Sequence, residues 1–296
     1  MKKFYLTLLM AIVECTWLYA DQVIVSMKQE TKYNVSTMNI EYNDAGLISK
    51  IVYQDDESFM EVQECSYDSG SFLIKETVKE GGETYQGQYT GTLSNGRLSK
   101  ISVNYYDFEY NFSELSYDQE GHLTGIVDNG DDELSTIYFT WADGNITNYK
   151  EYDENNKLVF DVNLTYGNTC NDLMLKWMAF FDYDLGDGGF WMFPFLGTPP
   201  RMLPIERNEQ EKGSEVKKTT FQFENDSNGL ITAIKKYRNG ELRSTITITW
   251  GERQSASVDN VVAEKKANSA TYSLEGYKAR PGQKGIVISN GRKIVR

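Results

Sequence analysis

A short pattern that occurs five times along the chain constrains its fold more than any other feature of the sequence. Each copy has a glycine, an apolar residue two positions later, a hydroxyl residue three positions later and a large apolar or aromatic residue five positions later. Polar residues that include Asp or Asn precede every glycine. The five glycines are Gly46, Gly96, Gly121, Gly144 and Gly229. Asp and Asn favour tight turns and glycine supplies a positive φ, so each copy predicts a β-hairpin.

The spacing inside the repeat indicates how the chain leaves each turn. The two apolar positions are three residues apart, and such residues face opposite sides of a regular strand. Either a bulge follows the turn or both faces of the strand are covered. Weaker copies occur at Glu154–Asn156 and Asn239–Gly240. The hairpins are too close together for helical crossovers, so residues 21–250 are predicted to be all-β: an antiparallel meander that forms a curved sheet or a partial barrel.

The repeat resembles a known sequence family. A Tyr-Asp turn and a glycine before a Leu-x-x-Ile strand, as in Tyr117-Asp118, Gly121 and Leu123–Ile126, are similar to the YD/RHS-type repeat. Over roughly residues 35–250, the order of hairpins, aromatic-rich insert and final hairpin resembles a family of uncharacterised exported proteins of Bacteroidota. The resemblance implies a β-repeat fold and a location outside the cytoplasm, and it implies no catalytic residue.

An aromatic-rich insert at residues 167–205 interrupts the repeats. Asn171 is placed to cap a short helix, and apolar residues follow at helical spacing. A single sheet must bury one face against something, so we expect the insert to pack on the concave face as a plug. A ligand or partner surface is the alternative. The residues that would form either one are Trp177, Phe181, Trp191 and Phe193.

The sequence offers little for metal or redox chemistry. Cys65 and Cys170 would form one disulfide in an oxidising compartment, or else two buried thiols. His122 lies in a turn without a cysteine nearby, so no zinc site is expected. The acidic loop at residues 182–187 lacks the spacing of a helix-loop-helix calcium site. We therefore predict no metal and no other cofactor.

The two ends of the chain differ from the body. Residues 1–20 have the basic start, apolar run and small final residue of a secretory signal; lipidation at Cys15 is the alternative. Residues 251–275 have the composition of a linker. Residues 276–296 are basic and predict a hairpin around Asn290-Gly291. This tail resembles the end of a type IX secretion sorting domain, which implies the secretion machinery as a partner.

Composition narrows the function to an exported protein without recognisable catalytic motifs. The formal net charge of −13 argues against nucleic acid as a partner. No second apolar run after the signal is long enough for a transmembrane helix. We expect a non-catalytic protein of the periplasm, outer-membrane surface or extracellular space that binds an unknown ligand or partner. The alternative is a glycan-active enzyme or a carbohydrate-binding protein, because paired carboxylates come from distant positions of a sequence.

Overall fold

The computed structural model describes residues 22–55, 58–105, 108–129, 134–180, 182–185, 189–252, 271–273, 286–289 and 292–295. The chain divides into two compact units, Met1–Gln254 and Ser255–Arg296. The predicted secretory signal at residues 1–20 lies outside the described residues.

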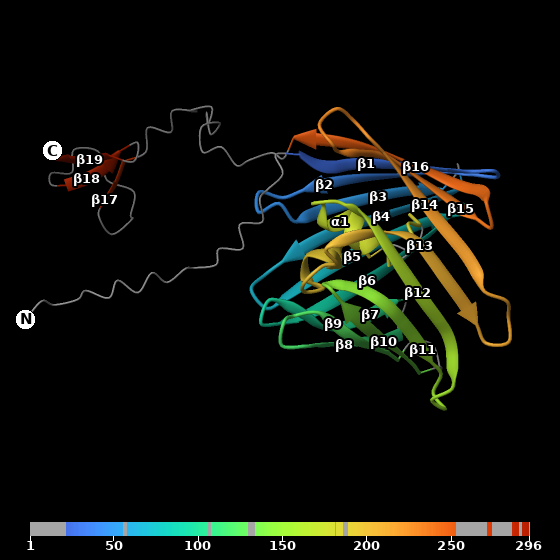
Figure 1. Cartoon of the computed structure of the whole chain (residues 1–296). Coiled ribbons are helices and arrows are strands. Elements are labelled where there is room, and N and C mark those ends of the chain that lie inside the picture. The colour runs from blue at the N-terminus through green and yellow to red at the C-terminus, as the bar shows by residue number, and fades with distance from the viewer. Residues whose placement is uncertain are drawn as a thin grey trace, which may run out of the picture. The chain divides into compact units, whose positions relative to one another are not determined.

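The strands of the first unit follow one another along the chain (Figure 1). They are β1 (Gln22–Thr31), β2 (Val35–Tyr42), β3 (Ile48–Asp55), β4 (Phe59–Tyr67), β5 (Ser71–Glu80), β6 (Glu83–Ser94), β7 (Arg97–Tyr105), β8 (Phe108–Tyr117), β9 (Leu123–Asp128), β10 (Ser135–Ala142), β11 (Asn145–Tyr152), β12 (Leu158–Thr169), β13 (Met202–Glu211), β14 (Lys217–Asn225), β15 (Ile231–Arg238) and β16 (Glu241–Glu252).

These strands form a closed antiparallel barrel. Each strand pairs with the next in the chain, and β16 returns to pair with β1 from Gln22 opposite Glu252 to Thr31 opposite Ser244. The all-β antiparallel meander is confirmed, but the expected curved sheet or partial barrel is wrong, because the sheet closes completely. Closure pairs the backbone N–H and C=O groups that two free edges would expose to other chains.

The repeat glycines lie at hairpin turns, as predicted. Gly46, Gly96, Gly121, Gly144 and Gly229 have φ angles between 73° and 85°, which residues with a Cβ rarely adopt. The predicted bulge is also present. In all five hairpins the register skips one residue after the turn, and the skipped residue is the hydroxyl residue of the repeat. Ser99 and Thr147 donate their hydroxyl hydrogens to Thr92 O and Thr140 O on the facing strands.

The apolar residue of each repeat also has a hydrogen-bonding role. Its carbonyl oxygen accepts a hydrogen bond from a Tyr or Trp side chain that lies 18 to 20 residues later, on the next strand. The pairs are Tyr67 with Ile48, Tyr117 with Leu98, Trp141 with Leu123, Tyr166 with Ile146, and Trp250 with Ile231. The bulge interrupts the regular ladder next to these carbonyls, and the aromatic side chains supply a donor.

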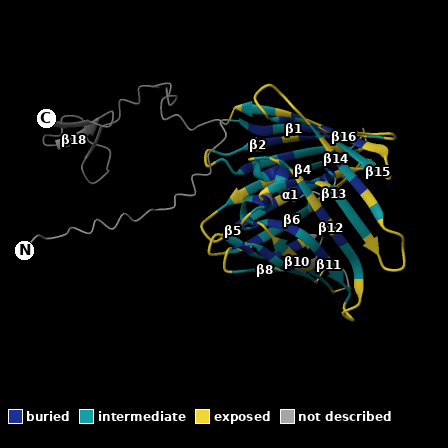
Figure 2. Ribbon diagram, in the orientation of Figure 1, coloured by how far each residue is buried: buried dark blue, intermediate teal, exposed yellow. Residues whose placement is uncertain are grey.

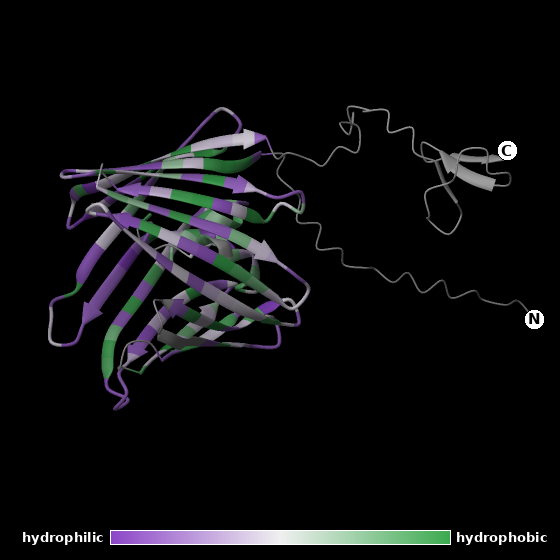
Figure 3. Cartoon of the chain, turned by 180° about the vertical axis from the view of Figure 1, so that it is seen from behind, coloured by the Kyte–Doolittle hydropathy of each residue, from purple (hydrophilic) through white to green (hydrophobic). Residues whose placement is uncertain are grey.

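The barrel has two different ends. The plug end carries the turns after the even-numbered strands, which include the repeat turns, and the polar end carries the turns after the odd-numbered strands. Burial and hydropathy alternate along many of the strands (Figures 2 and 3), as expected where successive side chains face the interior and the outside in turn. Toward the plug end the interior positions are apolar and buried, as at Ile40, Ile51 and Phe72. The interior positions toward the polar end include many charged residues.

The insert between β12 and β13 enters the barrel from the plug end. It contains α1 (Leu173–Met178) and the short 3₁₀ helix η1 (Phe190–Phe195). The side chain that caps α1 is Asp172, whose Oδ1 accepts a hydrogen bond from Leu175 N at 2.9 Å, and not Asn171 as the sequence suggested. Among the described residues, no helix is long and apolar enough to cross a bilayer.

Aromatic rings of the insert contact strands around the barrel. Phe195 stacks on Phe72 of β5 at 5.5 Å between ring centroids. Phe180 packs against Phe139 of β10 at 5.1 Å, and Tyr183 packs against Phe221 of β14 at 4.9 Å. The insert and the interior faces of the strands therefore form one hydrophobic core.

The second unit contains a small antiparallel sheet of β17 (Thr271–Ser273), β18 (Ile286–Ser289) and β19 (Arg292–Val295). The pairing of β18 with β19 matches the hairpin predicted in the tail. Its proposed turn at Asn290-Gly291 lies outside the described residues, as does most of the predicted linker at residues 251–275.

Candidate ligand site in the barrel interior

The aromatic residues singled out in the sequence lie in the insert. Trp177 is fully buried and Phe193 is 1% exposed, and both belong to the barrel core. Phe181 is outside the described residues. The backbone of Trp191 belongs to η1, and its side chain is not among those described. Trp177 and Phe193 therefore contact the protein's own core and present no surface to a ligand.

The two cysteines are free thiols rather than a disulfide. Cys65 lies on β4 and Cys170 directly after β12, and both are half-buried. Burial raises the pKa of the Cys65 thiol to about 12 and that of Cys170 to about 11. Thiols that stay protonated are poor nucleophiles and poor metal ligands, so neither cysteine is suited to catalysis.

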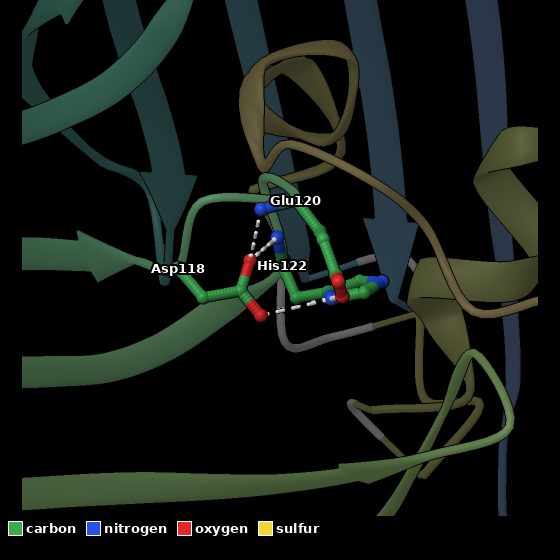
Figure 4. A group of neighbouring side chains, drawn as sticks. All are labelled: Asp118, Glu120 and His122. Atoms are coloured by element: carbon green, nitrogen blue, oxygen red, sulfur yellow. Dashed lines mark hydrogen bonds and ion pairs between the residues drawn. The ribbon is translucent and has the colours of Figure 1, made fainter.

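A cluster of Asp118, Glu120 and His122 lies in the turn between β8 and β9 (Figure 4). Their potential ligand atoms lie within 4.8 Å of one another, close enough for a metal ion. However, Asp118 Oδ1 accepts hydrogen bonds from the backbone N–H groups of Glu120 and His122, both at 2.9 Å. The His122 ring contacts Asp118 Oδ2 at 3.0 Å and stacks on Trp141. These contacts are those of an Asx turn, and they account for the cluster without a metal.

Polar side chains gather in the interior toward the polar end, beyond the insert. One group, which we call the acidic wall, consists of Glu61 and Gln63 on β4 and Glu76 on β5. Gln63 Nε2 donates hydrogen bonds to Glu61 Oε1 at 2.5 Å and to Glu76 Oε1 at 3.2 Å. Gln63 and Glu76 are each only 5% exposed.

The pKa of one carboxyl group of the acidic wall, that of Glu61, is raised above its ordinary value. Burial, together with the hydrogen-bonded carboxylate of Glu76, raises the pKa of Glu61 to about 8. Glycoside hydrolases hold their two carboxyl groups about 5 to 9.5 Å apart, with the substrate between them. A pair in direct contact leaves no such space, so the acidic wall does not resemble a glycosidase centre.

A second group, which we call the basic wall, consists of Arg207 on β13 with Lys236 and Arg238 on β15. All three converge on Asp182, which belongs to the insert. Lys236 Nζ donates to Asp182 Oδ2 at 2.5 Å and to the Asp182 carbonyl oxygen at 3.2 Å. Arg238 Nη2 lies 3.7 Å from Oδ2, and Arg207 Nη1 lies 3.8 Å from Oδ1. Glu209 pairs with Arg207 at 2.7 Å.

Exposure increases along the interior toward the polar end. The side chains of Lys236 and Arg207 are 11% and 12% exposed, whereas those of Arg238 and Lys217, nearer the polar end, are 37% and 44% exposed. The charged side chains nearest the polar end are therefore the ones most accessible to water. Sequence reasoning missed both walls, because strand alternation alone does not say which face of a mixed polar strand is the interior.

Comparisons with known proteins identify the fold and no family. No protein-family model matches the chain. No curated protein matches it. The chain is similar to the solved structure of a porin-like protein from Bacteroides uniformis ATCC 8492, with a TM-score of 0.55, 15% identity and coverage of 77% of this chain and 96% of that one. A porin-like protein from Bacteroides vulgatus ATCC 8482 has a TM-score of 0.53, 14% identity and coverage of 78% and 99%.

These matches correct the resemblances inferred from the sequence. The hairpins belong to a closed sixteen-stranded barrel like that of the porin-like structures, and not to a YD/RHS-type repeat or to a family built on it. No family model supports the similarity of the tail to a type IX sorting domain. Asp and Gly favour hairpin turns in β-proteins generally, so their presence at the turns does not identify a family. The chain has the fold of a porin-like barrel.

Proposed function

We propose that this protein is an exported barrel that remains in water and binds a small charged solute in its interior, at the polar end. The expectation of export rests on the secretory signal predicted at residues 1–20. The binding role rests on the two charged walls in the interior, and the side chains of Arg238 and Lys217 become more exposed toward the polar end.

The polarity of the outward face supports this proposal more than any other observation. A transmembrane barrel needs an outward apolar band about 25 Å tall with a polar interior. In this barrel, much of the outward face is polar and the interior toward the plug end is apolar. Outward positions of neighbouring strands carry charged or polar residues at mid-strand, such as Lys28, Asn39, Lys50, Glu64, Lys75, Gln88, Lys100, Asn148, Asn163, Asn208, Gln222, Lys235 and Thr247. Moving a single Lys to the midplane of a bilayer costs about 2 to 4 kcal/mol.

The insert supports the same proposal from inside. It fills the interior toward the plug end with buried aromatic residues that contact several strands. A conducting pore needs a continuous polar path, and a packed apolar core excludes water and ions. The barrel is therefore proposed to be closed at one end.

A transporter or channel of the outer membrane is the second candidate. The similarity to porin-like structures favours it, because a closed barrel is one of two backbone arrangements that can span a bilayer. The two candidates differ in the surroundings of the outward face, which is water in the first and lipid in the second.

Flotation with lipid vesicles separates the two candidates. The purified protein, refolded with and without vesicles of bacterial lipid, is centrifuged through a density gradient beside an authentic porin. We expect it to stay monodisperse without detergent and to remain at the bottom of the gradient, while the porin floats. Flotation in a carbonate-resistant form, together with ion conductance across a planar bilayer, would instead establish the channel.

A further inference from the structure

The basic wall and the two hydroxyl residues beside it lie on four neighbouring strands. Arg207 on β13 pairs with Thr219 on β14, which in turn pairs with Arg238 on β15. Lys236, two residues before Arg238, pairs with Ser244 on β16. Since residues that pair directly or lie two apart share one face of a sheet, all five side chains belong to the interior face. Thr219 and Ser244 are 2% and 4% exposed.

Polar atoms without a hydrogen-bond partner concentrate here. Within the part of the chain that the structure describes, six buried side-chain nitrogen or oxygen atoms have no such partner. Four of them belong to the basic wall and the residues beside it: Asp182 Oδ1, Arg207 Nε, Arg238 Nε and Ser244 Oγ. Proteins rarely leave such groups without a partner away from functional sites. Both donors and acceptors are present, which suits a ligand with a charged group and further polar atoms.

Asp182 reaches this region from the insert at a conformational cost. Asp182 and Tyr183 have φ angles of 56° and 50°, so two consecutive residues with a Cβ adopt the left-handed conformation. The turn places the Asp182 carboxylate next to three cationic side chains. The three cations share two carboxylates, Asp182 and Glu209, and Glu209 also pairs with Lys217 at 3.9 Å.

We propose that Arg207, Lys236 and Arg238 form a binding site for the carboxylate of a small anionic ligand, and that Asp182 occupies this site when the ligand is absent. A guanidinium group matches a planar carboxylate in shape and hydrogen bonding, and the group bound there now is itself a carboxylate. The site rests on the proposed function, because the ligand must enter from water at the polar end. As a tethered competitor, Asp182 acts at a high effective concentration and lowers the apparent affinity for free carboxylates.

The Asp182→Asn variant tests this proposal, because the amide keeps the shape of the side chain and removes its charge. Melting temperature is measured against increasing malonate, with sodium chloride at matched ionic strength. We expect the variant to be less stable than the wild type and to recover stability saturably with malonate but not with chloride. In the wild type, where Asp182 competes for the site, the malonate concentration that gives half of the stabilisation should be roughly tenfold or more higher than in the variant.

Two double variants provide the test of the site and its matched control. Asp182→Asn with Lys236→Gln should lose the malonate response. Asp182→Asn with Lys235→Gln should keep it, because Lys235 is on the outward face of the same strand and pairs with Glu224. Equal responses to malonate and chloride, or a response that survives Lys236→Gln, would show that Asp182 only anchors the insert.

If Asp182→Asn does not fold, equilibrium dialysis of labelled malonate decides: the wild type should bind it and Lys236→Gln should not. The flotation result is independent of these measurements, so failure of the site and failure of the proposed function are distinguishable.

Discussion

Glu61 illustrates how the tertiary structure changes the chemistry of a single residue. Its neighbours in sequence, Met60 and Val62, face outward, while its own carboxyl group faces Glu76 in the interior. Burial raises its pKa to about 8, so the folded protein holds a proton there that the unfolded chain, with a pKa near 4.5, releases. The stability that this proton provides is fully present below pH 4.5 and is lost as the pH rises through about 8.

Replacing Glu61 by Gln should remove this pH dependence. The free energy of unfolding of the wild type is expected to fall by on the order of 1 to 3 kcal/mol between pH 5 and pH 9, and that of Glu61→Gln should stay nearly constant. Urea denaturation across this pH range measures the difference. Glu64→Gln, an exposed outward position on the same strand, is the control and should behave as the wild type does. Parallel pH profiles for Glu61→Gln and the wild type would contradict the assignment of the proton.

The insert is the element that makes the barrel a packed protein. Sixteen strands enclose more space than their own interior side chains fill, as in large porins with water-filled channels. In this chain α1, η1 and the turn at Asp182 supply the missing apolar volume. The insert also positions Asp182 against the basic wall, so it contributes to the core and to the candidate site at once.

Substitution of buried aromatic residues in the insert should destabilise the whole barrel. Trp177→Ala and Phe193→Ala are each expected to lower the free energy of unfolding by about 3 to 5 kcal/mol, because both side chains are almost completely buried. The outward-facing Tyr138, which is 55% exposed, provides the control, and Tyr138→Ala should cost less than about 1 kcal/mol. Chemical denaturation measures all three. Wild-type stability of the Trp177 and Phe193 variants would mean that the insert does not belong to the core.

At the scale of the whole molecule, the pairing of β1 with β16 completes the barrel before the second unit begins. All sixteen barrel strands end by Glu252, and the division between the two units falls after Gln254. Among the described residues of the second unit, which are 271–273, 286–289 and 292–295, no strand contributes to the barrel. The barrel should therefore fold without the tail.

A chain that stops after residue 254 tests this independence. We expect the truncated protein to keep the urea midpoint of the full chain and the same dependence of the unfolding free energy on urea concentration. The free energy of unfolding should change by less than about 0.5 kcal/mol. A chain that stops after residue 240 lacks β16 and should fail to fold, because both new edges would be exposed. A marked loss of stability in the first truncation would show that the tail supports the barrel.

The local structure of the hairpins follows from the amino-acid sequence. Glycine at the turns, the hydroxyl residue at the bulge and the strands between them follow from interactions within about ten residues, and the structure confirms them at Gly46, Gly96 and Gly229. The location of the insert was also evident from composition, although its cap was misplaced by one residue.

Closure of the barrel and the candidate site, in contrast, depend on contacts between residues far apart in the sequence. The pairing of Thr31 with Ser244 joins opposite ends of the barrel chain, and nothing near either residue specifies the partner. Asp182 meets Lys236 only because β15 and the insert occupy the same interior. Turns depend on the conformational preferences of adjacent residues, whereas closure and charge pairing depend on which distant surfaces are buried together. Only the folded barrel determines that.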